Sequence, residues 1–191
     1  VVFLEQVHPQ AFLMPILARI IKEAKNNWIT PRSNAVPGYY SKTKGWVHGR
    51  SHEARPFAVR SLILYPMNAL VNDQLRRLRR ILSSQQSELW QKSHLNGNLI
   101  YFGMYTGDTE TTGHWTAKNK RTQWDRYINE VQNAWDSLSA DLRETGGWPK
   151  PNGSEMLSRW DMQEAPPDIL VTNYSMLEYM LVRPIESNIF E

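Results

Sequence analysis

In "RSLILYPMNALVNDQLRRLRRIL", residues 60–82, a predicted buried strand leads directly into a predicted helix. Residues 58–66 contain a short apolar run closed by proline, which is typical of a strand buried on both faces. The residues that follow carry apolar side chains at helical spacing, at Leu70, Leu75, Leu78, Ile81 and Leu82. A strand followed at once by a helix is the unit from which parallel sheets are built.

The same alternation continues through the rest of the chain. Residues 11–27 predict a helix, residues 96–109 a strand with a Gly-rich loop, and residues 114–144 a polar helical region. Residues 168–171 predict a third strand, and a further helix follows it. This order of helices and strands predicts an α/β fold, in which helices cover both faces of a parallel sheet.

The composition fits one globular domain of 191 residues with a net charge of +3. The absence of cysteine excludes disulfides and thiolate metal sites, and it favours a cytoplasmic location. No apolar stretch approaches the roughly 20 residues of a membrane-spanning helix, so no membrane partner is expected. Two stretches rich in Gly, Pro and polar residues, 28–57 and 145–167, predict loops.

Each predicted strand ends in a polar or glycine-containing corner. Ligands of parallel sheets bind at the carboxyl ends of the strands, so these corners predict one binding surface. The residues concerned are Pro66, Met67 and Asn68 after the first strand, Thr106 and Gly107 after the second, and Thr172 and Asn173 after the third.

Four segments resemble superfamily 2 DEAD/DEAH-box helicases. "LILYPMNALVNDQLRRLRRIL" resembles motif Ia, "YTGDT" the Ib or GG region, and "PPDILVTNYSMLEYMLVRP" motif Ic. "AFLMPILARIIKEA" resembles the helix that follows the Walker A phosphate loop. The segments occur in the family's order and cover most of the chain apart from its insertions. The likeness is to the large helicases of bacterial DNA repair and phage defence, of the MrfA-like and DISARM types.

The resemblance implies that residues 1–191 are a partial first RecA-like domain, an incomplete P-loop NTPase with insertions at 28–57 and 110–165. It implies that the complete protein is an ATP-dependent helicase or translocase that uses ATP and Mg²⁺. The remainder of the helicase would then be a partner of this chain. Nucleic acid, DNA in preference to RNA, would be the partner. The family's contacts with the sugar–phosphate backbone carry over to Pro66, Met67, Asn68, Thr106, Gly107, Thr172 and Asn173.

Elementary chemistry fits those contacts, because backbone amides at strand-to-helix corners and helix N-termini bind phosphate without reading base sequence. The alternative is that these residues only cap helices, as Thr172 or Asn173 could do. Arg76 to Arg80 could likewise touch nucleic acid, although a solvated helix surface is the simpler interpretation.

The catalytic residues of such a motor are absent from the sequence. No G-x-x-x-x-G-K-[ST] pattern occurs, and no acidic pair follows a strand. Gap-free alignment with the family puts His8 at the phosphate-binding lysine and Pro9 at the hydroxyl position. We therefore expect no catalytic residue, no metal site and no intact cofactor site in this chain, and no activity of the chain alone.

Residues 1–10 read as a degenerate Walker A region, and a frame shift could explain it. Residues 4–8 can be encoded TTG GAA CAG GTT CAC, and reading from the last base of the first codon gives Gly-Thr-Gly-Ser. We hypothesise that the chain is a fragment of a helicase gene. Two alternatives stay open, namely a non-catalytic module that binds nucleic acid or a partner, and an inert truncated product.

Two further features of the sequence have both a functional and a structural interpretation. The eight tryptophans could stack on bases, but burial that pins the insertions to the domain is the favoured interpretation. His48 and His52 have a spacing that suits a metal only on a helix, and they lie in a Gly-containing loop, so a zinc site is not predicted.

Overall fold

The structure is a computed structural model that describes residues 9–66 and 68–190. Its helices are α1 (Pro9–Asn27), α2 (Asn68–Leu82), α3 (Gln85–His94), α4 (Lys118–Ser137), α5 (Ala140–Glu144), α6 (Arg159–Glu164), α7 (Tyr174–Val182) and the 3₁₀ helix η1 (Pro184–Ile189). Its strands are β1 (Tyr39–Ser41), β2 (Gly45–Val47), β3 (Ser61–Tyr65), β4 (Phe102–Tyr105), β5 (Glu155–Met156) and β6 (Ile169–Asn173). None of the helices in these residues is long and apolar enough to cross a membrane.

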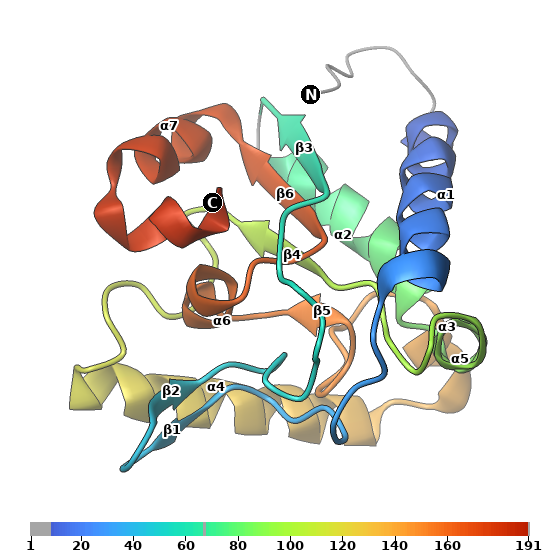
Figure 1. The fold of residues 1–191 in the computed structure, drawn as a ribbon. Coiled ribbons are helices and arrows are strands. Elements are labelled where there is room, and N and C mark those ends of the chain that lie inside the picture. The colour runs from blue at the N-terminus through green and yellow to red at the C-terminus, as the bar shows by residue number, and fades with distance from the viewer. Residues whose placement is uncertain (1–8, 67, 191) are drawn as a thin grey trace.

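The main sheet has four parallel strands in the order β3-β6-β4-β5, which confirms the predicted α/β fold (Figure 1). The strand that comes last in the chain, β6, lies between β3 and β4. The register pairs Ser61 with Ile169 and Tyr65 with Asn173. A separate antiparallel hairpin is formed by β1 and β2.

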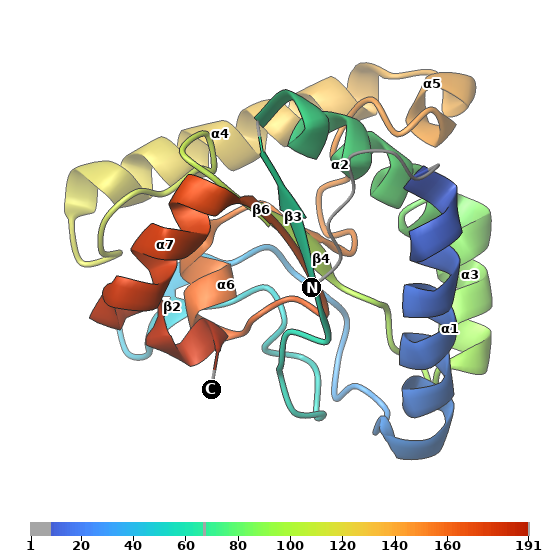
Figure 2. The ribbon, with the colours of Figure 1, turned by 90° about the horizontal axis from the view of Figure 1, so that it is seen from above.

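Helices cover both faces of the sheet, as the alternation of elements predicts (Figures 1 and 2). Successive side chains of a strand point to opposite faces, so β6 serves two hydrophobic cores. Ile169 and Val171 pack with apolar residues of α1 and α2, and Leu170 packs with Met162 of α6 and Met180 of α7.

The predicted helix 11–27 and the three predicted strands are confirmed, with boundaries shifted by a few residues. The interpretation of residues 145–167 as a loop is wrong, because this segment contains β5 and α6. Strand β5 has two residues and α6 has six, so neither is long enough to show a periodic pattern. The hairpin in residues 28–57 and helix α3 were also missed.

Three buried tryptophans join the two insertions to each other. Trp46 from β2, Trp124 from α4 and Trp160 from α6 form one cluster, with ring centroids of Trp46 and Trp160 4.8 Å apart. Their indole N–H groups donate hydrogen bonds to Asp161, Gly38 and Gly113, respectively. Burial, the favoured interpretation, is confirmed for these three, but their contacts join the two insertions to each other, and pinning to the body stays a prediction for them.

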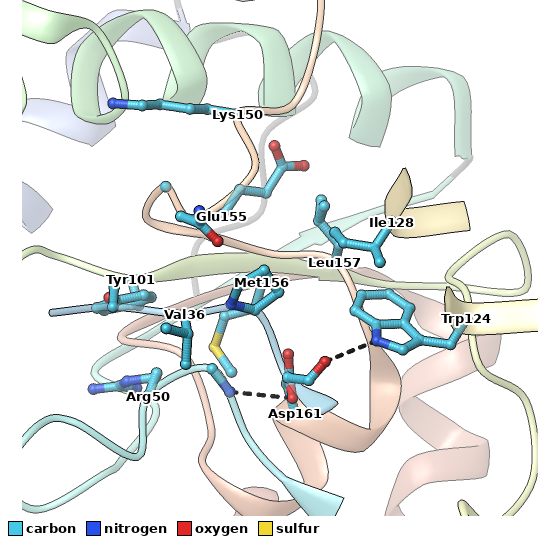
Figure 3. Close-up of a pocket in the computed structure, with 16 residues that line it drawn as sticks. Val36, Arg50, Tyr101, Trp124, Ile128, Lys150, Glu155, Met156, Leu157 and Asp161 are labelled. Carbon is cyan, nitrogen blue, oxygen red and sulfur yellow. Dashed lines mark hydrogen bonds between the residues drawn. The ribbon is translucent and has the colours of Figure 1, made fainter. Parts of the chain in front are cut away.

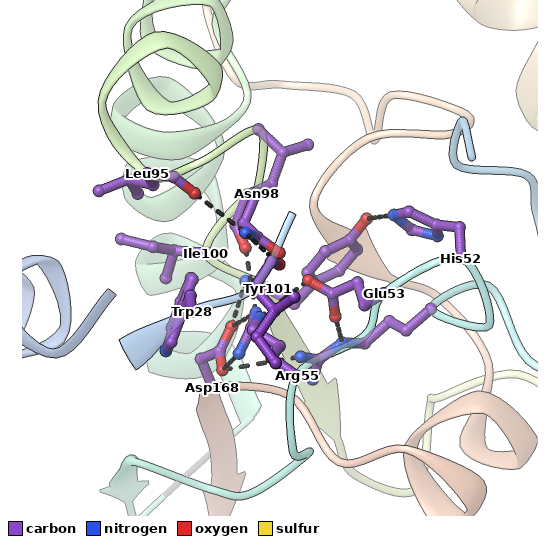
Figure 4. A network of polar contacts seen from close by, with 12 residues as sticks. Trp28, His52, Glu53, Arg55, Leu95, Asn98, Ile100, Tyr101 and Asp168 are labelled. Carbon is purple, nitrogen blue, oxygen red and sulfur yellow. Dashed lines mark hydrogen bonds and ion pairs between the residues drawn. The ribbon is translucent and has the colours of Figure 1, made fainter. Parts of the chain in front are cut away.

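A buried polar network fastens the segment before β3 to the amino end of β6 (Figure 4). Arg50 donates to Glu53 across 2.6 Å and to the carbonyl oxygen of Pro166. Arg60 donates to Asp168 across 2.8 Å, and the Tyr101 amide donates to the other carboxylate oxygen across 2.8 Å. The network lies at the end of the sheet opposite to the predicted binding corners.

Candidate nucleic-acid interface

The carboxyl ends of β3, β6 and β4 lie side by side at one edge of the sheet. The register pairs Tyr65 with Asn173 and Tyr105 with Thr172, so the corner after β6 stands between the other two. The predicted residues that the structure describes therefore share one edge, which we call the rim and define as Pro66, Thr106, Gly107, Thr172 and Asn173.

The central corner of the rim is built around the start of α7. Asn173 is its N-cap residue, and its Oδ1 accepts a hydrogen bond of 2.7 Å from the Met176 amide. Thr172 is buried, and its hydroxyl donates to the Tyr105 carbonyl oxygen across 2.5 Å. The capping role is thus confirmed for Asn173. Its contact with phosphate stays a prediction, compatible with the cap because a capped helix end still presents amides.

The corner after β4 is a tight, self-bonded turn. Thr106 is fully buried, and its amide donates to the Thr109 hydroxyl across 2.9 Å. Its own hydroxyl accepts from the Asp108 amide across 3.3 Å. Gly107 is exposed, and a Cβ added there would meet no atom within 4 Å. Gly107 is therefore the position of this turn where a ligand can approach the backbone closely.

The corner after β3 is described only in part. Pro66 is exposed and α2 begins at Asn68, but Met67 and the side chain of Asn68 lie outside the described residues. Below this corner, the Tyr65 hydroxyl donates to the Gln74 side chain across 3.0 Å, and both residues are buried.

A buried arginine supports the β4 corner from below. The Arg159 guanidinium donates to the carbonyl oxygens of Thr106 and Gly107 across 2.5 and 3.2 Å. Burial lowers the pKa of Arg159, partly offset by the charge of Glu186. Both acceptors are backbone atoms of the turn, so Arg159 stabilises the backbone conformation of the rim at this corner. The Arg159 guanidinium itself stays buried beneath the surface.

Tyr105 links this support to η1. Its hydroxyl donates to Glu186 across 2.9 Å and accepts from the Gln163 amide group across 2.8 Å. Burial, with a further contribution from the Glu186 charge, raises the pKa of Tyr105 well above its usual value. No sequence pattern predicts this network, because its members come from β4, α6 and η1, and only the fold brings them together.

A polar groove of about 260 Å³ extends from the β4 corner toward α4. Its lining residues are Gly107, Asp108, Thr109, Glu110, Thr111 and Thr112 from the loop, and Lys120, Gln123 and Trp124 from α4. The Lys120 ammonium group donates to the Thr112 hydroxyl across 3.3 Å. The groove therefore joins the rim to the first turn of α4.

The predicted phosphate-loop positions add little to this picture. His8 lies outside the described residues, and Pro9 begins α1. A cavity between residues 35–50, α4 and residues 150–161 measures about 40 Å³, which is far below the volume of a nucleotide pocket (Figure 3). Within residues 9–66 and 68–190, no group of three or more His, Cys, Asp or Glu residues could hold a metal ion.

The arginines of α2 are partly used within the chain. Arg79 forms a bidentate pair with Glu155 of β5, with distances of 2.6 and 2.7 Å. Arg77 pairs with Asp73 one helical turn away across 2.9 Å. These contacts favour the structural interpretation of Arg77 and Arg79, whereas Arg76 and Arg80 remain exposed.

Comparison with known proteins finds a relative of much greater length. No protein-family profile matches the chain, and no solved structure matches it. The chain is 30% identical over 225 residues to Druantia protein DruE of Escherichia coli (strain UMEA 4076-1). The match covers 95% of this chain and 11% of DruE, so the chain spans about a ninth of the curated relative that it matches.

Proposed function

We propose that this chain is part of the first motor domain of an ATP-dependent, helicase-like protein of a bacterial defence system. In this proposal the rim holds the sugar–phosphate backbone of a nucleic-acid strand, DNA in preference to RNA. The observation that carries it is the meeting of three strand-to-helix corners at one edge of the sheet. The similarity to Druantia protein DruE and the four helicase-like segments support it.

The chemistry of the rim suits a backbone ligand. The first turn of α7 presents amides beside its Asn173 cap, and Gly107 allows close approach of a phosphate. Groups of this kind do not distinguish bases, so we expect binding that tolerates any sequence and weakens as salt rises.

ATP and Mg²⁺ would be bound by the complete protein, together with residues outside this chain. Hydrolysis is the step that would move the rim along a strand, and this chain alone would supply the grip and not the energy. We therefore propose a strand-holding role for residues 9–190 within a larger motor.

Gly107 offers a sharp test of the rim. A Cβ at this position meets no neighbour, so Gly107→Ala and Gly107→Glu should both fold. In fluorescence anisotropy with labelled single-stranded DNA, G107E should bind about tenfold more weakly, because its carboxylate repels phosphate. G107A should bind like the unaltered chain.

Equal affinity of G107E and G107A would contradict contact at this corner. Salt-independent binding, or no binding by a chain that unfolds cooperatively, would contradict the backbone-holding role altogether. Binding without any dependence of the complete protein on ATP would instead favour the non-catalytic module.

A further inference from the structure

Two segments far apart in the sequence combine into a surface that carries cations without acids. Residues 28–52 and 111–124 contain no Asp or Glu. The first segment forms the β1–β2 hairpin, and the second leads into α4 beside it (Figure 1). They contain seven cations in all; Arg50 is buried and Arg32 precedes the hairpin, which leaves Lys42, Lys44, Lys118, Lys120 and Arg121 for this surface.

Aromatic rings are interleaved with these cations. The ring centroids of Tyr40 and Trp115 are 6.1 Å apart, and the Arg121 guanidinium carbon lies 3.9 Å from the centre of the Tyr40 ring. The His114 ring continues this row, and its centroid lies 4.9 Å from that of the Trp115 ring. Trp115 also packs on Gly45 of the hairpin, where an added Cβ would lie 2.8 Å from its ring. These contacts fix the hairpin against the start of α4.

Three of these cations lie at the amino end of α4, where positive charge is unfavourable. The first turn of α4 carries no acidic residue, and its N-cap, Ala117, makes no side-chain capping bond. The amino end of a helix favours negative charge, so Lys118, Lys120 and Arg121 oppose the helix dipole. A local arrangement that weakens its own element is expected where a binding site requires it.

We propose that this hairpin surface binds single-stranded nucleic acid, with lysines on the phosphates and aromatic rings stacked on bases. We define the hairpin surface as Tyr40, Lys42, Lys44, His114, Trp115, Lys118, Lys120 and Arg121. The inference rests on the proposed function for the kind of ligand, and it adds a second contact outside the rim. The polar groove that ends at Lys120 lies between the rim and the hairpin surface, and its lining also carries the acids Asp108 and Glu110.

The combination selects a single strand over other polyanions. A duplex offers phosphates but keeps its bases stacked, whereas an unpaired strand offers both phosphates and open rings. An acidic protein would use the lysines and leave the aromatic row without a role. The ring at position 40 should therefore matter as much as the charge around it.

The lysines are tested by charge reversal with a charge-matched control. Lys42 and Lys44 are exposed at the hairpin turn, and Lys22 and Lys92 are exposed on α1 and α3. With a labelled oligo-dT, the K42E/K44E chain should bind about tenfold more weakly. The slope of the logarithm of its binding constant against the logarithm of salt concentration should decrease in magnitude by about two. The K22E/K92E chain, which has the same net charge, should keep its affinity within about twofold.

A second pair of substitutions separates binding from folding. Lys118→Glu with Lys120→Glu places acids in the first turn of α4, so the melting temperature should rise while oligo-dT binding falls. Tyr40→Ala should weaken binding to oligo-dT more than to a duplex of equal length. Tyr39 points to the opposite face of the strand and is also exposed, so Y39A is its control.

The outcomes distinguish this inference from the function proposed for the rim. If G107E weakens binding and the hairpin variants do not, the rim stands and the hairpin surface is refuted. If the hairpin variants weaken binding and G107E does not, the hairpin surface stands without the rim. Equal loss for K22E/K92E, or binding of an acidic protein but not of oligo-dT, would overturn the hairpin proposal.

Discussion

Arg55 and Asp168 are 113 residues apart in the sequence, yet their side chains form a bidentate pair. Nη1 and Nη2 of Arg55 donate hydrogen bonds of 2.7 Å to Oδ1 and Oδ2 of Asp168, respectively. Both side chains are fully buried. The Arg55 guanidinium also lies 3.4 Å from the centre of the Trp28 ring. The carboxylate just before β6 thus holds Arg55 and Arg60 near the end of the segment that joins α1 to β3, and Arg55 in turn packs on Trp28 at its start.

Replacing Asp168 with Asn should destabilise the fold strongly. The substitution leaves Arg50, Arg55 and Arg60 around a neutral group, and breaking a buried ion pair costs about 3–5 kcal/mol. Urea unfolding measures the loss. Asp73→Asn is the control, because Asp73 pairs with Arg77 at the surface and should contribute less than about 1 kcal/mol. Equal losses for the two variants would contradict a central role for Asp168.

The same carboxylate should make the fold sensitive to acid. Burial by itself would raise the pKa of Asp168, but the charges of Arg50, Arg55 and Arg60 outweigh burial and hold the pKa below its usual value. Its stabilisation is therefore present above pH ~4 and is lost as the pH falls through the lowered pKa. The free energy of unfolding should fall below pH ~4 in the unaltered chain, and this part of the slope should vanish in D168N.

Asp161 should have the opposite effect in a different pH window. Burial raises its pKa to about 7, although hydrogen bonds from Trp46 and Gly49 oppose that rise. The protonated form is favoured in the fold, so stability should decrease from pH ~4 to the folded pKa by up to about 1.4 kcal/mol per unit. Asp161→Asn keeps an acceptor oxygen and should abolish this slope. A slope unchanged in D161N would show that another group is responsible.

Gly38 should tolerate no side chain. A Cβ at this position would collide with Asp161 Oδ1 and lie 2.6 Å from the Trp46 ring. Both neighbours are buried, so Gly38→Ala should cost about 1–3 kcal/mol in thermal unfolding. Gly107→Ala, which meets open space, is the matched control. A G38A chain as stable as G107A would mean that the tryptophan cluster can move aside.

The isolated chain should not hydrolyse ATP. The sequence holds no phosphate-loop pattern, so the amides and lysine that hold the phosphates of ATP in this family are not encoded here. Phosphate release should therefore equal the blank, with or without single-stranded DNA. Turnover that requires Mg²⁺ and stops with a chelator would refute the prediction.

The parts of the fold that the sequence predicts are those with a local signal. Strands β3, β4 and β6 are apolar runs closed by corners, and chain direction alone places their carboxyl ends at one edge. Strand β5 exists because β4 offers it a partner, so two residues suffice and no pattern marks them. Helix α6 has only six residues after its Ser158 cap, so no periodic pattern marks it either.

The candidate site divides in the same way. The rim residues follow from their positions after the strands, but the supports beneath them do not. Arg159 reaches the turn at Thr106 from 53 positions further along the chain, and Tyr105 reaches Glu186 across 81. The pairing of Tyr40 with Arg121 joins a predicted loop to a predicted helical region. Such contacts depend on how distant segments pack, which periodicity and spacing do not reveal.

The place of β6 between β3 and β4 has a consequence for how a cell makes this protein. Arg60 and Asp168, which stand at the starts of β3 and β6, are separated by 108 residues. As the chain leaves the ribosome, β3 and β4 emerge long before the strand that must be inserted between them. During that interval the edges of β3 and β4 that will pair with β6 are exposed, and unpaired strand edges are prone to aggregate. We therefore expect the strand order to delay completion of the sheet until β6 has emerged, and translation pauses before residue 168 would lengthen the exposure.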